Sequence, residues 1–296
     1  MNRTVRKRQS KSGMGVLYYV IFAILVFVFV GSAIYLIRYY GASKKSEDLV
    51  DDLRELTATD SPALSEMEKT EDKLPELTES EKEKKEPSKY MAVDGISVLR
   101  KYAALYQKNH DFVGWLTIPD TVIDYPVMYT PHNEEYYLRR DFDGNYSEAG
   151  TLFIDTDSDY KKPSDNVLIY GHNMNSGKMF HDLLKYEDEE FYKNHKQFTF
   201  DTIREEGTYE VIAAFRTVIY PETDTVNFKY YTFFNADTPK DFDIFVKNVK
   251  ALTPYRIDTT AEYGDLLLTL STCAYHDENG RYVVVAKKIM NDEREK

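Results

Sequence analysis

The chain of 296 residues has very little cysteine, since Cys273 is the only one. An internal disulfide is therefore excluded, and the folded part of the chain must be stabilised by core packing. The sequence also contains no internal repeat, no Gly-rich phosphate loop and no cluster of metal ligands. We therefore expect neither a cofactor nor a metal, and the lone thiol needs an explanation of its own.

The chain has fewer basic than acidic residues. It contains 38 Lys and Arg and 50 Asp and Glu, which gives a net charge of −12. Phosphate binding needs a basic face, so we expect no nucleic-acid partner. Much of the acidic excess lies in residues 41–90, where Tyr90 is the single aromatic residue. A segment of this composition cannot bury a core. We therefore predict a charged, disordered extracellular stalk over residues 38–90.

Charge is absent from residues 14–37, which are predominantly apolar. A helix of these 24 residues is roughly 36 Å long, enough to cross a hydrocarbon layer of about 30 Å. A cleaved signal peptide is the main alternative, but its apolar region is only about 7 to 15 residues long. We therefore predict an uncleaved transmembrane anchor at 14–37.

Basic residues flank the predicted anchor unequally. Five lie before it and three lie just after it, namely Arg3, Arg6, Lys7, Arg8 and Lys11 against Arg38, Lys44 and Lys45. Because the more basic side of an anchor stays inside the cell, we predict a cytoplasmic tail at residues 1–13. The remainder of the chain is then extracellular.

Aromatic and β-branched residues are dense beyond residue 90, which predicts a single domain over 91–296 that is mainly β. Apolar residues at helical spacing predict a lead-in helix over 94–109. Short β-type runs predict eight strands of a closed or nearly closed barrel, at 113–118, 122–129, 151–154, 166–170, 197–200, 208–219, 265–272 and 282–289. Two helices interrupt the strands, one beginning near Lys178 and a long one beginning at Pro239 with Thr238 as its N-cap.

Cys273 ends an apolar run that begins at Asp265. A strand holds the backbone of its last residue while its end stays open to substrate, so this placement suits a nucleophile. The alternative is a buried core cysteine, because free cysteines are among the most buried residues in proteins. The run by itself leaves both interpretations open.

His172 follows the apolar run 167–171 and therefore lies at the end of another predicted strand. A histidine at this position suits proton transfer, although a histidine held for structural reasons would give the same pattern. His276 lies in a polar turn and is expected to be a solvated loop residue. The other four are expected to be surface or structural residues, namely His110, His132, His181 and His195.

Arg281 opens the last predicted strand, shortly after Cys273. A hairpin between the two strands would bring Arg281 beside Cys273. A fixed guanidinium can stabilise the oxyanion that forms when a thiolate attacks an amide. An arginine that only keeps a strand soluble is the alternative.

Three motifs occur in a fixed order, namely Tyr-Gly-His-Asn-Met at 170–174, Thr-Leu-Ser-Thr-Cys at 269–273 and Arg-Tyr-Val-Val-Val-Ala-Lys at 281–287. The region 94–290, which contains these motifs, resembles the sortases, most closely class B. The predicted N-terminal anchor before this region fits the same family. The lead-in helix and the long helix before the cysteine strand, over about 239–252, strengthen this resemblance.

The resemblance implies an eight-stranded sortase-type β-barrel with an N-terminal helix, and the activity of a cysteine transpeptidase at the surface of a Gram-positive bacterium. It implies that Cys273 attacks the peptide bond after the threonine of a C-terminal sorting signal in a secreted protein, and forms a thioester. His172 would protonate the leaving amine, Arg281 would position the signal and stabilise the oxyanion, and Ser271 would hydrogen-bond the signal. The acceptor would be an amine of a peptidoglycan cross-bridge or of its lipid-linked precursor, or a pilin lysine.

Two other functions remain open. One is a catalytically silent, membrane-tethered module that binds surface proteins, and the other is a thiol hydrolase that resolves the thioester with water. Specificity is expected to depend on residues 216–239, including Phe228, Tyr230 and Tyr231. A third catalytic carboxylate is not identified, because Asp277 and Glu278 lie in a predicted turn.

Overall fold

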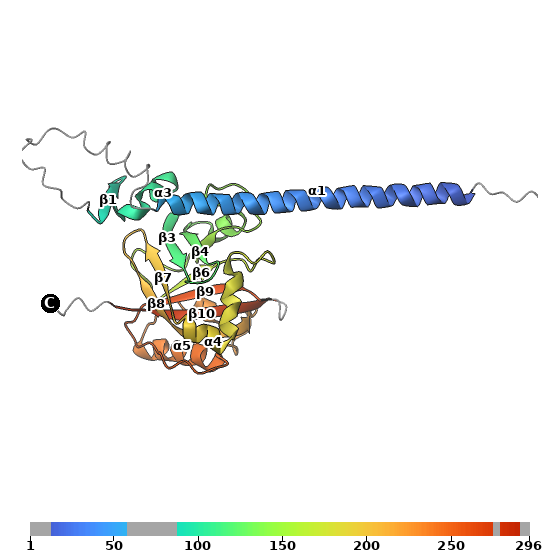
Figure 1. Cartoon of the computed structure of the whole chain (residues 1–296). Helices are drawn as coiled ribbons and strands as arrows, with labels where there is room; N and C mark the ends of the chain where they lie inside the picture. Colours follow the sequence, from blue (N-terminus) through green and yellow to red (C-terminus); the bar gives the residue numbers. More distant parts are fainter. Residues whose placement is uncertain (1–12, 58–87, 275–278, 291–296) are drawn as a thin grey trace, which may run out of the picture. The chain divides into compact units, whose positions relative to one another are not determined.

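The computed structural model describes residues 13–57, 88–274 and 279–290 (Figure 1). The chain divides into two compact units, with the boundary between Glu47 and Asp48. Residues 1–12 of the predicted tail and residues 58–87 of the predicted stalk lie outside the described residues. His276 and the turn carboxylates Asp277 and Glu278 lie outside them as well.

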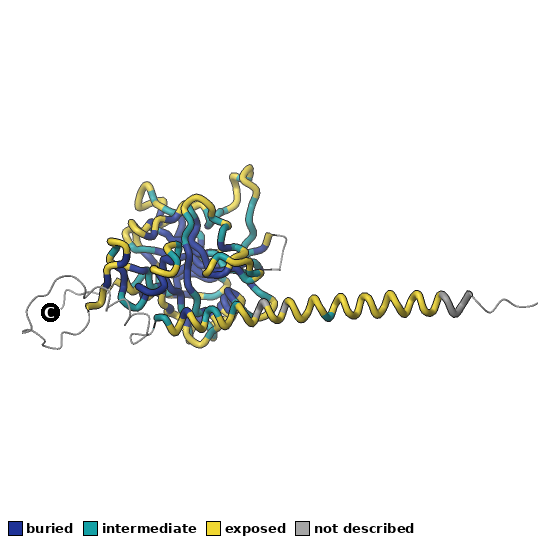
Figure 2. Tube along the Cα trace, turned by 90° about the horizontal axis from the view of Figure 1, so that it is seen from above, coloured by how far each residue is buried: buried dark blue, intermediate teal, exposed yellow. Residues whose placement is uncertain are grey.

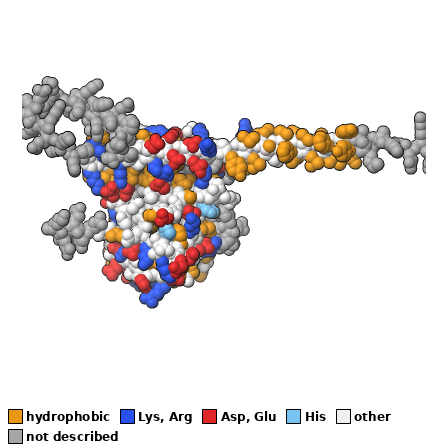
Figure 3. Space-filling view, in the orientation of Figure 1, with side chains coloured by type: hydrophobic (Ala, Val, Ile, Leu, Met, Phe, Trp, Pro, Cys, Tyr) orange, Lys and Arg blue, Asp and Glu red, His pale blue; other side chains and the backbone are white. Residues whose placement is uncertain are grey.

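The helix α1 (Gly13–Leu56) begins with an apolar stretch. Its part from Leu17 to Arg38 has a mean hydropathy of 2.9, and none of it is buried (Figures 2 and 3). By length and composition this part is long and apolar enough to cross a membrane. Its position agrees with the anchor predicted at 14–37.

The expectation of disorder from residue 38 onward is corrected by the second part of α1, which continues to Leu56. Leu53 is fully buried in the second unit, and Leu49 and Leu56 pack against the same cluster. These leucines recur at i, i+4 and i+7, so they form one apolar face of a helix. Arg54 adds an ion pair to Asp124, with 2.6 Å between Nε and Oδ2. Burial of this face explains why a charged segment is ordered.

The second unit contains a closed barrel of eight strands in the order β10-β8-β7-β3-β4-β5-β6-β9. Neighbouring strands are antiparallel except in the pairs β4–β5 and β6–β9. The eight predicted strands are confirmed, with every end within two residues of its expected position. They are β3 (Phe112–Thr117), β4 (Asp124–Met128), β5 (Leu152–Ile154), β6 (Asn166–Tyr170), β7 (Gln197–Thr202), β8 (Thr208–Val218), β9 (Leu267–Cys273) and β10 (Gly280–Lys288).

The lead-in helix predicted over 94–109 is wrong in its first half. A hairpin of β1 (Tyr90–Val93) and β2 (Ile96–Leu99) occupies this region. Its turn residues Asp94 and Gly95 both have positive φ, 49° and 77°, as a two-residue hairpin turn with Asp-Gly requires. Helix is confined to η1 (Arg100–Tyr102) and α3 (Ala103–Lys108).

The predicted long helix is confirmed as α5 (Pro239–Leu252), with Pro239 in its first turn. The Thr238 hydroxyl accepts a hydrogen bond from the backbone N–H of Asp241 at 3.3 Å. The helix predicted near Lys178 begins two residues later as the 3₁₀ helix η3 (Phe180–Glu187), which is followed by α4 (Glu189–Asn194). The remaining 3₁₀ helices are η2 (Glu134–Arg139) and η4 (Tyr230–Thr232).

Side chains alternate between the two faces of β9 and β10. Leu268 and Leu270 of β9 and Val284 of β10 fill the barrel interior. Val283 and Val285 of β10 belong instead to the outer cluster beneath α5. By the same alternation, the side chains at positions 271, 273 and 281 share the outer face of the barrel.

Candidate active site

Cys273 is the last residue of β9, and Arg281 lies directly opposite it on β10. The two strands are antiparallel, so the hairpin expected from the sequence does bring these residues together. Cys273 carries a free thiol and is partly exposed. The interpretation of a fully buried core cysteine is therefore excluded by its position.

His172 lies at the same end of the barrel. The strands β6 and β9 are parallel, and Tyr170 pairs with Ser271. His172 and Cys273 each come two residues after this pair. The backbone N–H of Gly171 donates to the carbonyl of Ser271 at 3.2 Å, and the Thr272 hydroxyl donates to the carbonyl of Gly171 at 2.7 Å. These bonds hold the segment that carries His172 against the end of β9.

The imidazole of His172 is oriented by a backbone carbonyl of η2. Its Nε2 lies 2.8 Å from the carbonyl oxygen of Leu138. Because a carbonyl can only accept a hydrogen bond, Nε2 carries the proton and Nδ1 holds the lone pair of the neutral ring. Burial lowers the pKa of His172; the bond to Leu138 opposes this shift, and Arg139 adds to it. The neutral ring can therefore accept a proton at Nδ1.

Ser271 has a protein partner inside the fold. Its side chain is 1% exposed, and its Oγ lies 2.6 Å from the hydroxyl of Tyr230. Tyr230 is also 1% exposed, and Arg281 and Cys273 act electrostatically on its hydroxyl. The pair Ser271–Tyr230 therefore forms a buried layer behind the exposed end of the site.

Two polar residues near Cys273 were not assigned to the site from the sequence. The Asn173 side-chain amide donates from Nδ2 to the backbone carbonyl of Cys273 at 3.0 Å. The Oδ1 of Asn173 lies 3.0 Å from Nδ1 of His181. The position of Asn173 directly after His172 was the available signal, whereas His181 has no local pattern that distinguishes it from a surface histidine.

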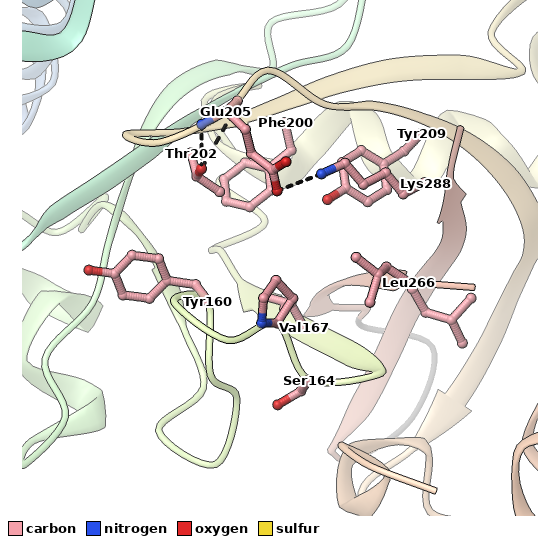
Figure 4. A pocket seen from close by; sticks show the side chains of 11 residues that line it. Tyr160, Ser164, Val167, Phe200, Thr202, Glu205, Tyr209, Leu266 and Lys288 are labelled. Atoms are coloured by element: carbon pink, nitrogen blue, oxygen red, sulfur yellow. Dashed lines mark hydrogen bonds and ion pairs between the residues drawn. The ribbon is translucent and has the colours of Figure 1, made fainter. Parts of the chain in front are cut away.

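A pocket lies at the opposite end of β6, β9 and β10 (Figure 4). It contains about 330 Å³ of empty space, part of which is open solvent, and its wall includes Val167, Leu267 and Lys288. The ammonium of Lys288 pairs with Glu205 at 2.6 Å. Because these residues lie at the start of β6 and β9 and at the end of β10, the pocket is separate from the end that carries Cys273.

The comparisons with known proteins agree with this geometry. The family model described as the sortase domain matches residues 116–289, more than half of the chain. Sortase B of Listeria monocytogenes is 34% identical over 187 residues, which cover 62% of this chain and 72% of that protein. Sortase B of Staphylococcus aureus is 30% identical over 194 residues, covering 64% and 75%.

The fold is similar to that of a solved class B enzyme. The crystal structure of sortase B from Bacillus anthracis in complex with AAEK1 matches with a TM-score of 0.57 and 36% identity. The match covers 66% of this chain and 86% of that one. The predicted sortase-type barrel is thereby confirmed. The chain therefore belongs to the sortase family, in class B, and is a sortase-type cysteine transpeptidase.

Proposed function

We propose that this protein is a membrane-anchored transpeptidase that cleaves a C-terminal sorting signal after threonine and transfers the secreted protein to an amine at the cell surface. The observation that carries this proposal is the pairing of Cys273 with Arg281, beside the strand end that leads to His172. A nucleophile, a guanidinium and an imidazole at one exposed strand end are the groups that acyl transfer through a thioester needs.

In the first half of the reaction, the thiol proton of Cys273 passes to Nδ1 of His172, and the thiolate attacks the threonine carbonyl. The guanidinium of Arg281 stabilises the oxyanion of the tetrahedral intermediate. The C–N bond then breaks, the imidazolium of His172 protonates the leaving amine, and the C–S bond of the thioester remains. Because burial lowers the pKa of His172, the imidazolium readily gives its proton to the leaving amine.

In the second half, an amine attacks the thioester. It loses a proton to His172, the C–S bond breaks, and the thiol of Cys273 is regenerated. The acceptor is an amine of a peptidoglycan cross-bridge or its lipid-linked precursor, or a pilin lysine. The apolar part of α1 supports an anchored, single-pass protein with its N-terminus in the cytoplasm and the barrel outside.

Ser271 has a less direct part in this proposal than the sequence indicated. Its hydroxyl is buried and bonded to Tyr230. A sorting signal could reach this hydroxyl only if Tyr230 moved away. We therefore retain Ser271 as a signal-binding residue only together with Tyr230.

The test uses the full chain in detergent micelles and a library of peptides with threonine before the scissile bond, with and without an amine acceptor. We expect transfer by the native protein, none by Cys273→Ala, and at least about a hundredfold loss of kcat/KM in His172→Ala and Arg281→Ala. Thermal unfolding of each variant separates loss of chemistry from loss of fold. Transfer of the peptide to the amine by Cys273→Ala would contradict the proposal.

The products distinguish the two remaining alternatives. Release of the cut peptide without any joined product, even with amine present, would identify a thiol hydrolase. Binding of peptides with no cleavage and no acyl adduct on Cys273 would identify a silent docking module. Mass spectrometry of the protein and of the peptide products reports both outcomes.

A further inference from the structure

We infer that Asn173 is a positioning residue of this site, which holds the backbone of the nucleophile Cys273, and that His181 fixes the orientation of Asn173. This inference rests on the proposed function of the same site. It is carried by a continuous chain of hydrogen bonds that runs from the surface to the carbonyl of Cys273.

The inner link of this chain is the bond from Asn173 Nδ2 to the carbonyl oxygen of Cys273, 3.0 Å long. Asn173 is 7% exposed, so water competes little for this bond. Cys273 is the last residue of β9. The residue after it, Ala274, donates its backbone N–H to the carbonyl of Gly280 at 2.9 Å. Asn173 therefore secures the last peptide of the strand from the side of β6, at the position where the ladder with β10 ends.

The outer link fixes which way the amide of Asn173 points. His181 Nδ1 lies 3.0 Å from Asn173 Oδ1. An amide oxygen can only accept, so the imidazole donates, and the NH₂ group must then face the carbonyl of Cys273. His181 is exposed and lies in the first turn of η3, so it orders Asn173 without entering the site.

The backbone between the two links brings them together. Asn173 and Met179 form an isolated antiparallel bridge, and the N–H of Phe180 donates to the carbonyl of His172 at 2.8 Å. His172 and Asn173 are neighbours in sequence, so one folded loop carries both the imidazole and the residue that holds the nucleophile. A displacement of this loop would move both reacting groups at once, and rates of oriented reactions depend steeply on such displacements.

The chemistry of position 173 offers a matched substitution. Asn173 presents an N–H donor to the carbonyl of Cys273 and an amide oxygen to His181. An aspartate in the same place has nearly the same shape, keeps an acceptor for His181, and replaces the donor by a negative charge.

The experiment compares Asn173→Asp, Asn173→Ala, His181→Ala and the double variant Asn173→Ala/His181→Ala in the full chain in detergent. His110→Ala is the matched control, because it removes an exposed histidine whose partner is Asp94 in the β1–β2 turn. The readouts are kcat and KM for peptide transfer, the rate at which iodoacetamide alkylates Cys273, and the thermal midpoint.

We expect Asn173→Asp to lower kcat at least about tenfold while KM stays within about threefold, and to slow alkylation several-fold. His181→Ala should lower kcat about threefold. In the double variant it should add nothing to the loss in Asn173→Ala, because His181 acts through Asn173. His110→Ala should behave as the native protein.

Three results would overturn the inference. One is a kcat within about twofold of native in Asn173→Asp, which would make Asn173 a packing residue. Another is independent, multiplying losses in the double variant, which would separate His181 from Asn173. The third is unchanged alkylation in Asn173→Asp. If the native protein transfers no peptide, the proposed function fails, but the alkylation rates still decide whether Asn173 positions Cys273.

Discussion

Gly150 keeps the partner of His172 in place through the absence of a side chain. Its φ is 61°, and a Cβ at this position would lie 2.4 Å from the carbonyl oxygen of Leu138. That carbonyl accepts the hydrogen bond from Nε2 of His172. A residue that never touches the site therefore determines where the imidazole points.

We predict that Gly150→Ala lowers kcat/KM roughly tenfold, because the added methyl group displaces the Leu138 carbonyl and with it the imidazole. The control is Gly95→Ala, where φ is also positive, at 77°, but nothing lies within 4 Å of the added Cβ. Gly95→Ala should lose about 1 kcal/mol of stability from its backbone conformation. Gly150→Ala should lose more in urea unfolding, because its Cβ also meets the Leu138 carbonyl. Equal activities of the two variants would refute this account.

The half-buried imidazole of His172 also makes stability depend on pH. Burial lowers the pKa of His172 below its usual value of 6.5. Between the two values the unfolded chain binds a proton that the folded chain does not, so the free energy of unfolding increases with pH there. The stabilising difference is complete above the unfolded pKa and is lost as pH falls toward the folded pKa.

We therefore expect the native protein to lose more stability than His172→Gln when pH falls from about 7 to about 5. Glutamine keeps a donor for the Leu138 carbonyl and does not titrate. Urea unfolding of both proteins, followed by the fluorescence of the single tryptophan, gives the two curves. Parallel curves would show that His172 titrates alike in the folded and unfolded chains.

The helix α5 supports the site from outside the barrel. Its buried residues Phe242, Phe245, Val246 and Val249 pack with the outer faces of β8 and β10 in one cluster. Tyr230 belongs to the same cluster. The helix thus packs with the strand that carries Arg281 and with the tyrosine behind Ser271.

The first turn of α5 allows a test of how much the capping residue of this helix contributes to stability. The hydroxyl of Thr238 accepts from the backbone N–H of Asp241 and donates to its carboxylate at 2.6 Å. Thr238→Ala should reduce the free energy of unfolding by about 1 kcal/mol, whereas Thr238→Ser keeps the hydroxyl and should lose at most a few tenths. If the two variants unfold at the same urea concentration, the cap does not contribute.

The helices and strands were largely predictable from the sequence. All eight strands follow from short runs of β-type residues, and α5 follows from apolar residues at helical spacing and from the capping signal at Thr238. The hairpin β1–β2 was not predicted, because the apolar residues of 96–109 fit helical spacing, whereas Ile96–Leu99 form a strand after the turn at Asp94 and Gly95. Disorder was predicted where α1 continues as a helix beyond Glu47. Only three leucines form its apolar face there, and the residues they contact lie far away in sequence.

At the scale of the molecule, the catalytic unit begins earlier than the predicted boundary at residue 91, because residues 48–57 belong to it. Leu53 is fully buried there, and Arg54 pairs with Asp124. Asp124 also accepts hydrogen bonds from Trp115 at 2.7 Å and from Thr117 at 2.8 Å. The end of α1 is thereby tied to β3 and β4 of the barrel.

We predict that Leu53→Ala lowers the free energy of unfolding by about 2 to 4 kcal/mol in a protein that begins at Asp48. Glu55→Ala, at an exposed position of the same helix, should change it by less than about 0.5 kcal/mol. A protein that begins at residue 88 should be destabilised at least as much as Leu53→Ala. Equal stability of all of these proteins would show that the end of α1 is dispensable.

The sequence by itself determined the class of the molecule, because runs of β-type residues, an uncharged apolar run and three ordered motifs are local patterns. It also determined that Cys273 and Arg281 lie together, since a hairpin joins strands that are adjacent in sequence. Only the tertiary structure decided the rest of the site. The carbonyl of Leu138 that orients His172, the link from Asn173 to Cys273 and the tyrosine behind Ser271 all join residues at least 34 positions apart. Such contacts depend on how the barrel closes, and no local pattern encodes them.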